Sequence, residues 1–60
     1  MILKSLVTVS DTVEYRAWLE ENCGAESVDW EFQYWKFTTI YGVRIVDPEV
    51  ETLFRLKFSA

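Results

Sequence analysis

The spacing of hydrophobic and polar residues predicts a mixture of strands and helices. Residues 2–9 are mostly aliphatic and β-branched, with polar breaks such as Lys4, which is typical of a strand. Over residues 28–34 hydrophobic and polar side chains alternate strictly, so this segment predicts a strand with one aromatic and one acidic face. A second β-rich run over residues 39–46 follows it. These two strands are predicted to form a hairpin.

The connection between the two strands carries no standard turn signature. Asn-Gly, Asp-Gly and Pro are all absent between Tyr34 and Thr39. The alternation also slips at Trp35, so Trp35 and Phe37 cannot both follow the preceding aromatic face into one core. We therefore expect a loop or a β-bulge here, with Gly42 marking a bend and at least one of the two rings exposed.

The first helix is predicted over residues 12–22. Ser10 and Asp11 offer N-cap oxygens, with an acid three residues after Asp11, and Gly24 provides a stop after Asn22. The apolar residues of this segment share one face at helical spacing: Tyr15, Trp18 and Leu19.

The second helix is predicted to open at Asp47-Pro48, an N-cap acid followed by proline at the first helical position. Its hydrophobic residues fall on one helical face: Val50, Leu53, Phe54 and Phe58. The last residues also alternate between apolar and basic types, so a short helix followed by a strand over residues 53–59 is the alternative.

The order β-α-β-β-α, with an optional final strand, resembles a truncated ferredoxin-like arrangement. It predicts an α+β fold in which two helices cover one face of a small antiparallel sheet. Sixty residues allow a single domain, 1–60, and Trp30 and Phe32 are expected in its core.

Composition argues against an enzyme. The chain has no His, and its two glycines form neither a P-loop nor a dinucleotide-binding turn. Its single cysteine, Cys23, has no imidazole to activate it and is expected to be a packing residue. Asp29 and Glu31 lie two apart on one strand face, where a solvated surface is the simplest interpretation. We expect no cofactor and no metal.

Charge and aromatic content favour protein binding. The net charge is −4, and residues 11–31 hold seven acids against one base. Such a segment can dock on a basic surface in the manner of a DNA mimic. Its candidate contact residues are Glu20, Glu21, Asp29 and Glu31.

A second candidate surface is the hairpin tip, because a chain this small cannot bury three Trp, three Tyr and four Phe completely. Its candidate contact residues are Trp35, Lys36, Phe37 and Tyr41. The first hypothesis is thus a non-enzymatic protein-binding module. The alternative is a structural or self-assembling subunit that buries aromatics between copies. A third hypothesis, single-stranded nucleic-acid binding by sheet aromatics, is disfavoured by the acids interleaved along the same strand.

The chain shows no sign of membrane targeting. The opening residues have Lys4 in their middle and lack a small-residue cleavage signature, unlike a signal peptide. No stretch approaches the roughly 20 apolar residues that span a bilayer. We expect a cytoplasmic protein without a membrane partner.

The C-terminal run from Gly42 to Phe58 resembles the endings of small uncharacterised accessory proteins of tailed bacteriophages. Those proteins often close on Phe-Lys/Arg-Leu-Lys/Arg followed by an aromatic residue, and here residues 54–58 read Phe-Arg-Leu-Lys-Phe. The resemblance covers about a third of the chain and defines no site residues. It implies a phage-encoded inhibitor or modulator of a host enzyme, acting in the host cytoplasm.

Overall fold

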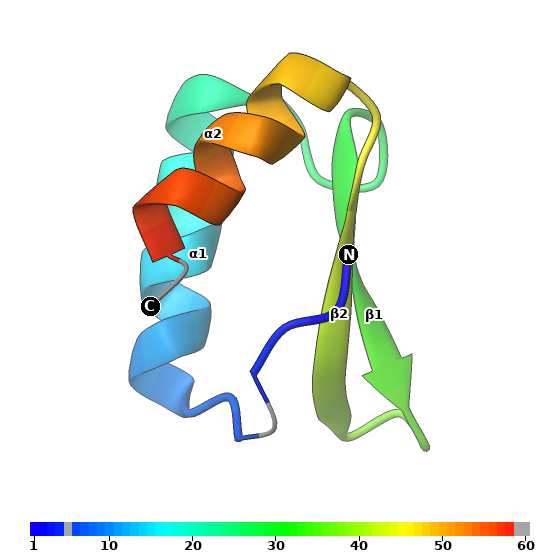
Figure 1. Ribbon diagram of the computed structural model, residues 1–60. Helices are drawn as coiled ribbons and strands as arrows, with labels where there is room; N and C mark the ends of the chain where they lie inside the picture. Colours follow the sequence, from blue (N-terminus) through cyan, green and yellow to red (C-terminus); the bar gives the residue numbers. More distant parts are fainter. Residues whose placement is uncertain (5, 59–60) are drawn as a thin grey trace.

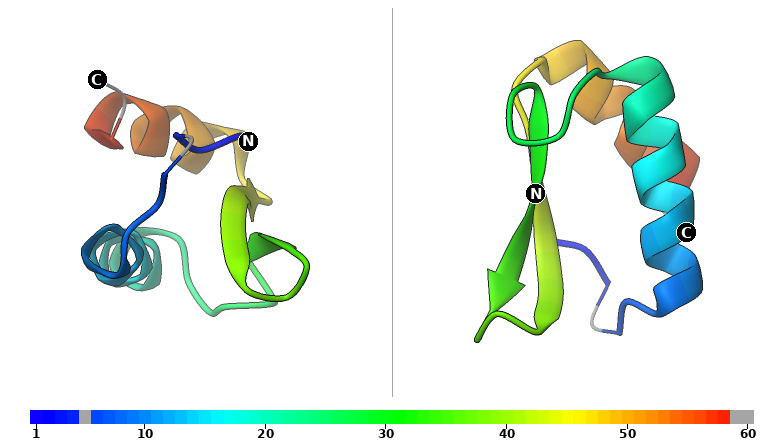
Figure 2. Two further views of the ribbon diagram at one scale, coloured as in Figure 1. Left: turned by 90° about the horizontal axis from the view of Figure 1, so that it is seen from below. Right: turned by 180° about the vertical axis from the view of Figure 1, so that it is seen from behind.

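The computed structural model of the chain describes residues 1–4 and 6–58. Its elements follow in the order α1 (Val9–Asn22), β1 (Trp30–Trp35), β2 (Thr39–Ile45) and α2 (Pro48–Phe58). The two strands pair as an antiparallel hairpin, and both helices lie on one side of it (Figures 1 and 2). The predicted α+β class, with two helices on one face of an antiparallel sheet, is confirmed.

Helix α1 begins three residues earlier than predicted. Thr8 is the N-cap: its Oγ1 accepts a hydrogen bond from the Asp11 N–H (3.1 Å), and Asp11 Oδ2 accepts one from the Thr8 N–H (2.9 Å). This reciprocal capping box satisfies two backbone donors at once. The prediction that Ser10 or Asp11 caps the helix was therefore wrong, because Thr8 has a carboxylate partner three residues on.

The strand predicted over residues 2–9 is not formed, and in its place Ile2 makes an isolated antiparallel bridge with Gly42 of β2. The Met1 amino group donates to the Val43 carbonyl, the Val43 N–H donates to the Met1 carbonyl, and the Leu3 N–H donates to the Tyr41 carbonyl, each at 2.9 Å. Residues 1–3 thus line the edge of β2 in an antiparallel direction, where the first strand of a ferredoxin-like arrangement lies. Residues 6–8 belong to no strand, because the capping box commits Thr8 to α1. Ser5, also in the predicted strand, lies outside the described residues.

The hairpin contains the β-bulge that was one of the two predicted alternatives. Gln33 pairs with Gly42, but Tyr34 pairs with Ile40, so Tyr41 is the extra residue of β2. Gly42 is required here for close approach: a Cβ at this position would lie 2.7 Å from the Met1 carbonyl oxygen. The glycine predicted to mark a bend therefore also makes room for the N-terminal segment.

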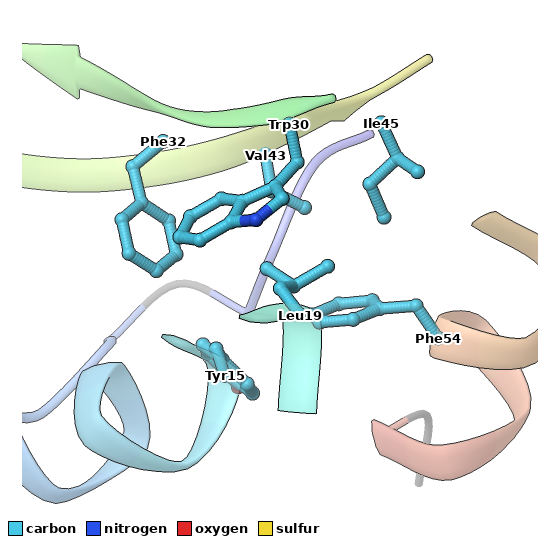
Figure 3. Close-up of a cluster of buried hydrophobic side chains, with 7 residues drawn as sticks. All are labelled: Tyr15, Leu19, Trp30, Phe32, Val43, Ile45 and Phe54. Atoms are coloured by element: carbon cyan, nitrogen blue, oxygen red, sulfur yellow. The ribbon is translucent and has the colours of Figure 1, made fainter. Parts of the chain in front are cut away.

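The core lies between the hairpin and the two helices, as Figure 3 shows. It consists of seven buried residues: Tyr15, Leu19, Trp30, Phe32, Val43, Ile45 and Phe54. Trp30 is fully buried and packs edge-to-face against Phe32, with 5.2 Å between the ring centroids. Its Nε1–H donates to the Gly24 carbonyl (2.9 Å). The predicted core roles of Trp30 and Phe32 are confirmed.

Helix α2 continues to Phe58, so the alternative of a final strand is wrong for the described part of residues 53–59; Ser59 lies outside it. Phe54 and Phe58 contact each other at 4.7 Å between ring centroids and both pack against Tyr15. Leu53, predicted on the buried face, is exposed instead. Phe54 and Phe58, four residues apart, define the buried stripe and leave Leu53 beside it.

Candidate functional site: the aromatic hairpin tip

β1 turns into β2 at the lower right of Figure 1, and several exposed aromatic residues belong to this end of the hairpin. Phe37 is 97% exposed and Trp35 is 61% exposed, which confirms the prediction that at least one of these rings lies outside the core. We call the following group of exposed residues the aromatic tip: Tyr34, Trp35, Lys36, Phe37 and Tyr41. The tip brings together the four hairpin residues predicted as contacts and adds Tyr34.

The backbone of the aromatic tip is strained at two residues. The Thr38 N–H donates to the Trp35 carbonyl (3.3 Å), which closes a turn with Lys36 and Phe37 at its centre. Lys36 has φ 53° and Phe37 has φ 67°, the left-handed region that glycine and asparagine occupy most easily. For other residues this conformation costs about 1–2 kcal/mol each. Sequence reasoning missed this turn because neither residue is one that such turns prefer.

Lys36 gives the aromatic tip a positive charge. Its Nζ lies 5.6 Å from the centroid of the Trp35 ring, a cation–π contact worth about 0.5–1 kcal/mol at an exposed site. Within residues 1–4 and 6–58, no ion pair includes Lys36. Its ammonium group is therefore available to a carboxylate of a partner.

A second group of exposed apolar residues lies near the start of α1. A shallow hollow of about 280 Å³ lies between residues 6–9 and residues 38–40, so these two segments are neighbours. Leu6, Val9 and Val13 are all exposed, and Val9 and Val13 are one helical turn apart on α1. Apolar side chains are therefore exposed near the start of α1 as well as at the aromatic tip.

Two of the predicted acidic contact residues already have partners inside the molecule. Glu31 Oε1 accepts a hydrogen bond from Arg44 Nε at 2.9 Å, across the outer face of the hairpin. Asp29 Oδ2 accepts the Ala25 N–H at 3.0 Å and fixes the loop before β1. Both carboxylates therefore already interact within the molecule and are less available to a partner.

The other two acidic candidates, Glu20 and Glu21, are exposed near the C-terminal end of α1. The structure therefore places the four acidic candidates on α1, in the loop before β1 and on β1 itself. In the part of the chain that the structure describes, no group of three His, Cys, Asp or Glu residues could hold a metal ion. No geometry in these acids defines a chemical site.

Cys23 is the C-cap of α1 and packs against the core. Burial raises the pKa of the Cys23 thiol, and the nearby Asp29 and Asp47 carboxylates raise it further. Its Sγ donates to the Asp29 carbonyl at 3.6 Å. A thiol that stays protonated at neutral pH is a poor nucleophile, which agrees with the packing role expected for Cys23.

Two of the sheet aromatics are unavailable for base stacking. Trp30 and Phe32 point into the core, and Arg16 lies over both rings, 5.8 and 5.2 Å from their centroids. Arg16 is also paired with Glu26. Of the hairpin aromatics Trp30, Phe32, Tyr34 and Tyr41, the last two are exposed.

Neither α1 nor α2 is long and apolar enough to cross a membrane, and the described residues contain no other helix.

No protein-family model matches this chain, and neither the curated proteins nor the solved structures gave a match. A functional assignment therefore depends on the chemistry of the surface itself.

Proposed function

We propose that the chain is a non-enzymatic protein-binding module that inserts its aromatic tip into an apolar pocket of a partner protein. The observation that carries this proposal is Phe37, a large ring that is 97% exposed on a backbone with positive φ. The ring contributes almost nothing to the core, and glycine would adopt this conformation at lower cost. Backbone strain at an exposed residue is frequent at binding sites.

The composition of the aromatic tip indicates the chemistry of its partner. Trp and Tyr are frequent anchor residues in protein interfaces, and Trp35 stands beside Phe37 on the same turn. Lys36 adds a charge that has no carboxylate partner among the described residues. The pocket that fits this tip is apolar and has an acidic residue on its rim.

The identity of the partner follows from the resemblance of the C-terminal run to phage accessory proteins. Under this proposal the partner is a bacterial host enzyme, and the chain inhibits or modulates it in the host cytoplasm.

The proposal is tested by capture from a bacterial lysate with four immobilised proteins: wild type, Trp35→Ala, Phe37→Ala and Val28→Ala. Val28 is the matched control, because it is also exposed but lies before β1, at the opposite end of the hairpin from the tip. We expect a host protein that wild type and Val28→Ala retain. With purified components, Trp35→Ala should weaken its affinity about 30-fold, the loss of roughly 2 kcal/mol expected for a hot-spot residue. Equal affinity of all four proteins would contradict the proposal.

A charge-reversal variant separates this contact from acidic mimicry. Glu20→Lys/Glu21→Lys changes two exposed charges on α1 and should leave affinity for the host protein nearly unchanged. Asp29 is unsuitable for this test, because its carboxylate accepts the Ala25 N–H and reversal would alter the loop. Loss of binding in the double variant, with normal binding by Phe37→Ala, would move the contact to the acidic surface.

A further inference from the structure

Residues 1–3 line the edge of β2 and present their own outer side to solvent. Met1 and Leu3 direct their backbone groups toward β2, where they form the three hydrogen bonds described above. In an antiparallel pair these bonds alternate, so the N–H and carbonyl of Ile2, between them, point away from β2. Among the described residues neither group has a backbone partner. An open edge of this kind is a template for another strand.

A groove lies beside this edge. It has a volume of about 340 Å³ and is bounded by residues 1–4, by Tyr15 of α1 and by the last turns of α2. Figure 1 shows the N-terminal segment (dark blue) starting in front of β2. Helix α2 lies on the same side of the hairpin as α1. Two of the bounding side chains are largely exposed, Ile2 at 75% and Leu56 at 74%. The edge therefore has apolar side chains beside its open backbone groups.

The charges of the groove are balanced within the chain. Lys4 Nζ lies 2.8 Å from Asp11 Oδ2, and Arg55 Nη2 lies 3.5 Å from Glu51 Oε1. Both cations thus have a carboxylate partner, so a ligand in the groove does not need to bring an acidic group. A second copy, which carries the same two ion pairs, can approach without placing unpaired like charges face to face.

We propose that this edge pairs with the same edge of a second copy about a two-fold axis. Antiparallel strands present the same pattern of donors and acceptors to each other, so the edge is complementary to itself. Centred on Ile2, the pairing lets its N–H donate to the carbonyl of the partner's Ile2 and its carbonyl accept the reciprocal bond. The sheets of the two copies become continuous, and Ile2 and Leu56 are covered at the junction.

The pairing is short, and this fixes its expected strength. It adds only two backbone hydrogen bonds, so burial of the flanking apolar side chains supplies most of the free energy. Interfaces of small area are weak, and we expect a dissociation constant on the order of 10 to 100 µM. The dimer should therefore form and dissociate within a measurable range of protein concentration.

The test measures molecular mass by analytical ultracentrifugation from about 5 to 500 µM, a range that brackets micromolar affinity. The compared proteins are wild type, Ile2→Pro and the matched control Ile2→Val. Proline removes the outward N–H of residue 2 and leaves the Met1 and Leu3 hydrogen bonds to β2 in place. Valine keeps both the N–H and a β-branched side chain. We expect wild type and Ile2→Val to dimerise. The dimer of Ile2→Pro should have a dissociation constant at least about tenfold higher than that of wild type.

A second measurement on wild type does not depend on how the proline variant folds. The amide of Ile2 should exchange with solvent more slowly as protein concentration rises, because pairing buries it. The amide of Leu3, already bonded to the Tyr41 carbonyl, serves as the internal reference and should change much less.

Three results would overturn the inference. They are a wild type that stays monomeric at the highest concentration, an Ile2→Pro variant that dimerises as well as wild type, and a dimer that is lost in Phe37→Ala. The last of these would assign self-association to the aromatic tip. The proposed function is tested by variants of the tip alone, so either proposal can fail without the other.

Discussion

Replacing Phe37 by glycine should make the protein more stable. Most substitutions of large apolar residues in small domains are destabilising, because the side chain leaves a packed core. Phe37 is the reverse case: its ring is 97% exposed, and its backbone has φ 67°. The change removes almost no buried surface and relieves a conformation that residues with a Cβ adopt at a cost.

The magnitude follows from two opposing terms. Relief of the left-handed conformation is worth about 1–2 kcal/mol, and the greater entropy of glycine in the unfolded chain costs about 0.5–1 kcal/mol. The two ranges leave a net gain with a midpoint of about 0.75 kcal/mol, which in a domain of this size raises Tm by about 6 °C.

The assay is thermal and urea unfolding followed by far-ultraviolet circular dichroism, with Phe37→Ala as the matched control. Alanine also removes the ring but keeps the Cβ and therefore the strain, so its stability should stay within about 0.5 kcal/mol of wild type. The two variants together separate the contribution of the ring from that of the backbone. Both should lose affinity for the partner if the aromatic tip binds as proposed.

A destabilised Phe37→Gly variant would refute this reasoning. It would mean that the ring contributes to stability in solution, or that the turn does not hold residue 37 at positive φ. Equal stabilisation by alanine and glycine would also refute it, because the gain would then come from removing an exposed ring and not from the backbone.

Three further predictions concern the core, the N-terminal edge and acid stability. Trp30→Ala should cost about 3–5 kcal/mol, most of the stability of a small domain, and circular dichroism should show a largely unfolded chain. Gly42→Ala places a Cβ 2.7 Å from the Met1 carbonyl oxygen and should cost about 1–3 kcal/mol, measured by urea unfolding. The hydrogen bond from Lys4, with those from Thr8, lowers the pKa of Asp11 from 3.8 to about 2. Its stabilising contribution is therefore present above pH 3.8 and is lost as the pH falls toward 2. Asp11→Asn should flatten the dependence of the urea midpoint on pH in that window, and an unchanged dependence would contradict the capping role.

The core of the hairpin could be predicted from local pattern. Strict alternation identified Trp30 and Phe32 as buried, because successive side chains of a strand point to opposite faces. The start of α2 was also predicted correctly. Asp47 acts as the N-cap residue, because its Oδ1 accepts a hydrogen bond from the Glu49 N–H at 2.9 Å. The break in alternation also predicted that at least one of Trp35 and Phe37 is exposed, and both are.

The candidate site could be predicted only in part. Its residues were found, but the strained turn was not, because Lys36 and Phe37 have no preference for positive φ and are held there by the pairing of the flanking strands. Sequence reasoning also missed that Asp29 fixes the loop before β1, and predicted it as a free contact residue. Whether its carboxylate is free or accepts the Ala25 N–H depends on the path of the loop.

The sequence by itself determined which residues are apolar, how they alternate and where helices can start, and these local properties were enough for the α+β class. Only the tertiary structure decided how far each element extends. Residues 2–9 have the composition of a strand, but Thr8 and Asp11 gain a reciprocal capping box, and only residues 1–3 reach the edge of β2. That edge approaches so closely because residue 42 lacks a Cβ. Contacts between residues some 40 positions apart depend on the packed fold, which no local pattern encodes.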